Sequence, residues 1–141
     1  MRSRLTDGPL DPGAGLQHIR CMTARTQLDQ HRSALAGASV EAGEIALGSR
    51  AALAAWVGTH RSQITRVARG QELGGEEGWR LSALAAVVTA LLSIYEPEAV
   101  SGWLHGSNPH LDDRRPLDVL ARGDVAAVMA AVQAARTGVY A

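Results

Sequence analysis

Hydrophobic and polar residues follow one another along this chain with the period of helices. Residues 76–95 are the most apolar stretch, and apolar side chains recur on nearly every side of its helical wheel. This pattern predicts a central helix that other elements surround. Three further helices are predicted to begin at Pro97, at Pro116 and after Asp124, because proline suits the first helical position and aspartate is a good N-cap.

Residues 49–70 predict a helix-turn-helix. Ser49 is a good N-cap, and Gly58 ends the first helix. Thr59 is expected to cap the second helix, which ends at Gly70. Aliphatic side chains at helical spacing would make the two helices pack on each other: Leu53, Val57, Ile64 and Val67.

The N-terminal part of the chain has a weaker pattern. Residues 1–23 contain two prolines and three glycines without periodicity, which predicts a disordered leader. Residues 24–36 are compatible with a helix. Val40, Ile45 and Leu47 then need burial, but glycines at positions 37, 43 and 48 are expected to interrupt any regular element formed by this stretch.

Composition supports an all-α fold. Hydrophobic residues make up 46% of the chain, enough for a core, but only 4% are aromatic and there is no Phe. The core must therefore be built from Ala, Val and Leu, and Ala and Leu favour helices over strands. We expect a helix-turn-helix domain over residues 24–75 and a helical second domain over residues 76–141.

The charge is unevenly spread, although the net charge is zero. Residues 49–75 carry four Arg and one Glu, whereas residues 76–141 carry five Arg and eight Asp or Glu. A basic segment followed by an acidic one suggests two tasks, one of them the binding of a polyanion.

The second helix of the helix-turn-helix offers a candidate DNA-contact face. Arg61 and Gln63 lie in its first turn, where a recognition helix presents side chains to bases, and Arg and Gln can read guanine and adenine. The candidate DNA-binding residues are Arg61, Ser62, Gln63, Arg66 and Arg69. The alternative is an ordinary solvated, Arg-rich helix face, and four Arg would bind DNA weakly without a dimer or a larger assembly.

No pattern of catalysis, metal binding or cofactor binding stands out. His105 and His110 are separated by Asn108-Pro109, which prevents both from sharing one helix face. The lone Cys21 excludes an internal disulfide. We therefore expect neither an enzyme nor a bound cofactor or metal.

The sequence also predicts neither a signal peptide nor a membrane-spanning helix. Arg2 and Arg4 are followed by Pro and Gly, not by an apolar signal segment. The apolar run Leu81–Leu92 is shorter than the about 20 residues that a bilayer requires. We expect a cytoplasmic protein without a membrane partner.

Residues 102–141 resemble a known family. The motif consists of a Trp, a turn with Asn and Leu, a Pro-Leu-Asp-x-Leu segment, a Gly, a last helix and a tail ending in Gly-Val-aromatic. These features resemble the C-terminal toxin-binding domain of Xre/MbcA/ParS antitoxins, and the helix-turn-helix also lies where that family has one. The residues that carry the resemblance are Trp103, Asn108, Leu111, Pro116, Leu117, Asp118, Leu120, Gly123, Gly138, Val139 and Tyr140.

The resemblance implies an antitoxin that binds and blocks a RES-domain toxin, an enzyme that degrades NAD. It implies that the C-terminal domain packs on the toxin, that the tail obstructs the NAD pocket, and that many members repress their own operon. A homodimer within a toxin–antitoxin hetero-oligomer is expected. The toxin-binding residues would be Trp103, Arg114, Arg115, Arg136, Thr137, Gly138, Val139, Tyr140 and Ala141.

Two other interpretations remain open from the residues alone. One is a helix-turn-helix transcriptional regulator without a toxin partner, and the other is a helical adaptor protein without a DNA role. For the tail, the alternative to a plug is a frayed terminus whose Tyr140 folds back on the core.

Overall fold

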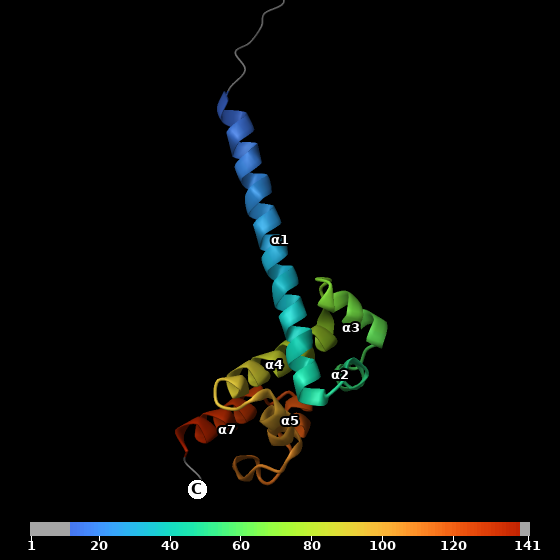
Figure 1. Cartoon of the computed structure of the whole chain (residues 1–141), viewed down its shortest axis with the longest axis vertical. Helices are drawn as coiled ribbons and strands as arrows, with labels where there is room; N and C mark the ends of the chain where they lie inside the picture. The colour runs from blue at the N-terminus through green and yellow to red at the C-terminus, as the bar shows by residue number, and fades with distance from the viewer. Residues whose placement is uncertain (1–11, 139–141) are drawn as a thin grey trace, which may run out of the picture. The chain divides into compact units, whose positions relative to one another are not determined.

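The computed structural model describes residues 12–138 of the chain, and the predicted all-α fold is confirmed there (Figure 1). In this range there is no strand, and one isolated β-bridge joins Asn108 to Arg114. The chain divides into two compact units, residues 1–32 and residues 33–141, which are described separately. The elements are α1 (Pro12–Leu47), α2 (Arg50–Val57), α3 (Arg61–Ala68), α4 (Gly75–Leu92), α5 (Pro97–His105), the 3-10 helix η1 (Pro109–Leu111), α6 (Pro116–Ala121) and α7 (Val125–Thr137).

The described part of the first unit is the beginning of α1. Residues 12–23 are helical, in contrast to the disordered leader predicted for residues 1–23, while residues 1–11 lie outside the described residues. Residues 16–32 contain neither proline nor glycine and include several Leu, Gln and Arg residues, which favour a helix over an extended chain. Pro12 itself suits the first position of a helix.

In the second unit, α1 continues without a break to Leu47, so the prediction that Gly37 and Gly43 interrupt it was wrong. Gly43 is buried, and a Cβ at this position would lie only 2.5 Å from Cδ1 of Leu53. The glycine therefore lets α1 approach α2 closely. This packing offsets the about 0.5–1 kcal/mol by which a glycine destabilises a helix.

The predicted helix-turn-helix is formed by α2 and α3. The hydroxyl of Ser49 accepts a hydrogen bond from the backbone N–H of Ala52 at 3.1 Å, as expected of an N-cap. Gly58 ends α2 in a left-handed conformation with φ of 94°. The N-cap of α3 is His60 instead of the predicted Thr59, and it makes no side-chain capping bond. All four predicted inward side chains are buried: Leu53, Val57, Ile64 and Val67.

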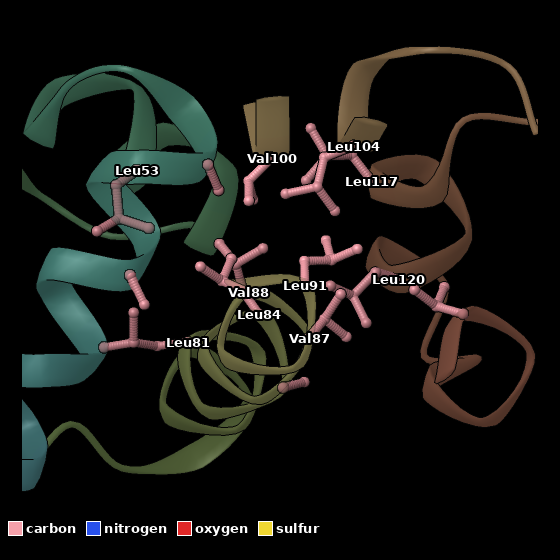
Figure 2. Packing of buried hydrophobic residues seen from close by; sticks show 14 of the residues in the cluster. Leu53, Leu81, Leu84, Val87, Val88, Leu91, Val100, Leu104, Leu117 and Leu120 are labelled. Atoms are coloured by element: carbon pink, nitrogen blue, oxygen red, sulfur yellow. The ribbon is translucent and has the colours of Figure 1, made fainter. Parts of the chain in front are cut away.

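Helix α4 lies at the centre of the second unit, in contact with α2, α5, α6 and α7. Figure 2 shows side chains of α4 pointing towards Leu53 on one side and towards Leu117 and Leu120 on the other. The buried side chains of α4 occupy most of its circumference: Leu81, Ala83, Leu84, Val87, Val88 and Leu91. Such a helix must be covered on most sides, which explains why the short helices surround it.

The remaining helices begin where the sequence predicts. Pro97 and Pro116 occupy the first turns of α5 and α6, and the carboxylate of Asp124 accepts a hydrogen bond of 3.0 Å from the N–H of Ala127 in α7. The last helix ends at Gly138, whose φ is 67°. The prolines and Asp124 fix where these helices begin, because each removes or satisfies an unpaired backbone N–H at a helix start.

One hydrophobic cluster connects all helices of the second unit, from Val40 in α1 to Val132 in α7. Residues on both sides of position 75 contribute to it. The division between residues 24–75 and 76–141 therefore remains a prediction about separate functions and not a description of separate cores.

We predict opposite effects for two alanine substitutions at helical glycines. Gly43→Ala would push a methyl group into the buried Leu53 and should lower the free energy of unfolding by about 1–2 kcal/mol. Gly102→Ala is the matched control, since a Cβ there meets nothing within 4 Å, and it should raise that free energy by about 0.5–1 kcal/mol. Urea unfolding of both variants measures the difference, and equal shifts would contradict the close contact of α1 with α2.

Candidate functional site

The second unit has a hollow of about 240 Å³ near the end of α7. It lies where α5, the turn around η1 and the last turns of α7 meet. Its walls are partly aromatic and partly the small side chains of α7. The residues that line it are Tyr95, Gly102, Trp103, Gly106, Ser107, Asn108, Pro109, His110, Ala131 and Ala135.

Helix α5 brings Trp103 to this hollow. The hydroxyl of Ser101 donates a hydrogen bond of 3.1 Å to the carbonyl of Ala46, which ties α5 to the end of α1. On the same helix, Val100 and Leu104 are fully buried, and Trp103 lies between them in sequence. Trp103 itself is only partly buried. Part of its side chain packs against the core, and another part lines the hollow.

Asn108 organises the turn that forms another wall. Its side-chain oxygen accepts a hydrogen bond of 2.9 Å from the N–H of His110, and its N–H donates to the carbonyl of Arg114 at 3.1 Å. The turn is closed on itself by these bonds, and Leu111 anchors it in the core. Asn108 is the one polar residue that is buried among residues 22–138, and its side chain is satisfied within the turn.

The two candidate arginines after this turn differ in their surroundings. Nε of Arg114 donates to the carbonyl of Leu111 at 3.0 Å, and its Nη2 lies 3.2 Å from the carboxylate of Asp112. Arg115 is exposed and forms the N-cap position of α6 without a side-chain capping bond. Arg114 is thus used locally, whereas Arg115 extends from the surface. Neither arginine lines the hollow.

The predicted tail is described as far as Gly138. Arg136 and Thr137 are exposed in the last turn of α7, where the Thr137 hydroxyl bonds to the carbonyls of Gln133 and Ala134. The other predicted tail residues, Val139, Tyr140 and Ala141, lie outside the described residues. Of the toxin-binding residues predicted from the sequence, the structure brings Trp103 close to the α7 surface that leads to the tail, through the hollow that both line.

Several residues of the hollow were not predicted as functional. Tyr95 follows α4 directly, and His110 lies in η1, so each comes from a different segment than Trp103. No local pattern marks such residues, because only the tertiary fold brings them together. Trp79 is another unexpected feature, since 45% of this large aromatic residue is exposed on α4. Exposed tryptophan is often found at protein interfaces.

The candidate DNA-binding residues lie on one exposed face of α3. Arg61, Ser62, Arg66 and Arg69 are exposed, and Gln63 is partly buried. Nη1 of Arg66 lies 3.4 Å from Oε1 of Gln63, so these two side chains face each other. A shallow depression is lined by Arg61, Ser62, Thr65, Arg66 and Arg69. The geometry is compatible with a polyanion contact, and the role of these residues stays a prediction.

Other chemistry has little support in the described residues. Within this range no group of three or more His, Cys, Asp or Glu residues is arranged to hold a metal ion. The helices described between residues 12 and 138 include none that is long and apolar enough to span a membrane.

Comparison with known proteins identifies the C-terminal half. Residues 83–138 match the model of the antitoxin Xre/MbcA/ParS C-terminal toxin-binding domain. This segment begins inside α4 and ends at the glycine that terminates α7. Comparison with curated proteins gives no match.

A solved structure shares the fold. A chain in the crystal structure of the M. tuberculosis MbcT-MbcA toxin-antitoxin complex is similar with a TM-score of 0.62 and 24% identity, over 74% of this chain and 96% of that chain. The similarity extends well beyond residues 83–138 and establishes a common helical fold. Residues 83–138 thus resemble the C-terminal toxin-binding domain of Xre/MbcA/ParS antitoxins in sequence, and the chain shares the helical fold of a chain from a toxin-antitoxin complex.

Proposed function

We propose that this chain is an antitoxin, and that it neutralises a RES-domain toxin that degrades NAD in the cytoplasm. Its C-terminal domain would pack on the toxin, and its tail would obstruct the toxin's NAD pocket. The observation that carries the proposal is the toxin-binding domain match over residues 83–138, which ends where the tail begins. The antitoxin itself would catalyse nothing and would act by occupying space.

The chemistry of the tail suits a nucleotide pocket. Arg136 and Thr137 are exposed at the end of α7, and Gly138 ends the helix so that the chain can leave it in a new direction. Beyond them the sequence supplies an aromatic ring at Tyr140. A pocket that binds phosphates and flat rings has cations and apolar walls, which could accept these groups.

Arg115 is the better of the two arginine candidates for a direct toxin contact. The guanidinium of Arg114 already contacts the carbonyl of Leu111 and the carboxylate of Asp112. The exposed Arg115 keeps its donors available at the surface, and arginine binds carboxylates with two parallel hydrogen bonds. Trp103 would support the adjoining surface from within the core.

For the helix-turn-helix we propose binding to operator DNA and repression of the antitoxin's own operon. The exposed arginines of α3 support this role, since phosphate contacts are the main source of affinity for DNA. Arg61, Arg66 and Arg69 in a single copy would give weak binding. A homodimer within a toxin–antitoxin assembly would supply a second copy of the same face.

Cellular NAD measures the proposed target. Expression of the adjacent open reading frame alone should deplete NAD, and co-expression with this antitoxin should restore it, because a blocked toxin cannot reach its substrate. If the neighbouring gene changes neither NAD nor growth, the RES-toxin proposal is wrong. The interpretation as a regulator without a toxin would then be preferred.

Removal of residues 136–141 tests the role of the tail. The truncated chain should still bind the toxin but should lose neutralisation, because the domain surface remains while the group that enters the pocket is gone. Arg122→Ala is a matched control, since Arg122 is exposed in the same domain but distant from the tail in sequence. Full protection of cells by the truncated chain would show that the tail is not a plug.

DNA binding is tested by the double substitution Arg66→Ala and Arg69→Ala. Binding to the operator region should weaken by about 10-fold or more. The steepness of the plot of log affinity against log salt should fall by roughly 1–2, because two phosphate contacts, each of which releases about one counterion, would no longer form. The double substitution Arg122→Ala and Arg136→Ala is a control of equal charge change in the other half of the chain. Equal losses in both double variants would indicate a non-specific charge effect in place of contact through α3.

A further inference from the structure

The hollow beside α7 has the size of one aromatic side chain. Its volume of about 240 Å³ is below the roughly 300–1,000 Å³ of pockets for drug-sized ligands. Trp103 and Tyr95 supply aromatic surface, and Ala131 and Ala135 leave room because their side chains are small. A dinucleotide such as NAD would not fit, whereas a single ring would.

The last helix leads the chain to this hollow. Ala131 and Ala135 are one turn apart and face it, and Gly138 follows Ala131 by seven residues, which places it on the same side of α7. The left-handed conformation of Gly138, with φ of 67°, stops the helix at this point. Gly138 therefore lies at the end of the helix face that borders the hollow.

The remaining residues have the length that is needed. Ala135 precedes Gly138 by three residues, a rise of about 4.5 Å along the helix. Two extended residues cover roughly 7 Å, so the chain from Gly138 to Tyr140 can return over Ala135. Tyr140 is the only aromatic residue after Trp103 in the sequence.

From these observations we propose that the hollow is the resting site of the antitoxin's own tail. In the toxin-free protein the ring of Tyr140 would pack between Trp103 and the alanines of α7. Offset or edge-to-face packing of two aromatic rings stabilises such a contact beyond the area that it buries. The Tyr140 hydroxyl would meet the polar rim, where Ser107 and His110 offer hydrogen-bonding groups.

The tail would then have two mutually exclusive positions. Docked in the hollow, it is held in a defined place in the free antitoxin; undocked, it is available to the toxin. The second position rests on the proposed function, but the first concerns the antitoxin alone. Occupation of the hollow multiplies the apparent affinity for the toxin by the fraction of molecules whose tail is undocked, so that more docking means weaker binding.

NMR spectroscopy of the full chain without toxin tests the docked position. We expect nuclear Overhauser contacts from the ring protons of Tyr140 to the methyl groups of Ala131 and Ala135. Tyr140→Ala should shift the indole N–H resonance of Trp103 and leave those of Trp56 and Trp79 in place, since neither lines the hollow. Arg136→Ala is the control for a change near the tail that leaves the ring intact.

A second variant fills the hollow instead of removing the ring. Ala135→Leu should erase the Tyr140 contacts while the dispersion of the other resonances shows that the fold persists. If the native chain shows no such contacts and Tyr140→Ala leaves Trp103 unshifted, the inference is wrong. It is also wrong if a mixture of labelled and unlabelled chains shows that the ring comes from a second copy.

The toxin assay separates this inference from the proposed function. Contacts of Tyr140 in the free chain together with full neutralisation by the chain truncated before residue 136 would support tail docking and contradict the plug. Absence of the contacts together with loss of neutralisation on truncation would contradict docking and support the plug. If both proposals hold, Ala135→Leu should bind the toxin several-fold more tightly than the native chain, because its tail has no competing site.

Discussion

Burial of the nearly all-round apolar helix α4 is the constraint on which the arrangement of the second unit depends. Leu84, Val87, Val88 and Leu91 are completely removed from solvent, and no single neighbouring helix could cover them. Short helices from both halves of the sequence therefore surround α4 (Figures 1 and 2). Because the chain lacks Phe, this covering depends on many small aliphatic contacts, and close approach of backbones at Gly43 becomes important.

The helix-turn-helix and the segment that matches a toxin-binding domain share this core. Leu53 of α2 and Leu120 of α6 both face α4, although the two functions that we propose for their halves are different. A common core keeps α3 and α7 in one compact unit. The basic face of α3 and the segment that matches a toxin-binding domain are thus parts of one packed structure.

Local signals made much of the fold predictable. Ser49, Gly58, Pro97 and Asp124 act through backbone hydrogen bonds or dihedral angles that depend on a few neighbouring residues, and their helices begin or end as the sequence indicates. Gly43 was misjudged because its effect depends on Leu53, ten residues away in another helix. The hollow could not be predicted for the same reason, since its walls come from segments that are distant in sequence and the pattern of any one of them is uninformative.

The turn between α5 and α6 has a consequence for how the surface of this chain can change. Asn108 closes the turn through bonds to His110 and Arg114, and Leu111 fixes it to the core, while the intervening Asp112 and Asp113 project into solvent. Its shape is thus maintained by two inward residues and by backbone atoms that every amino acid except proline possesses. The two outward aspartates nevertheless have positive φ, 55° at Asp112 and 59° at Asp113, a conformation that Asn, Asp and Gly tolerate best. The surface of this loop can therefore vary at little cost to folding only among such residues.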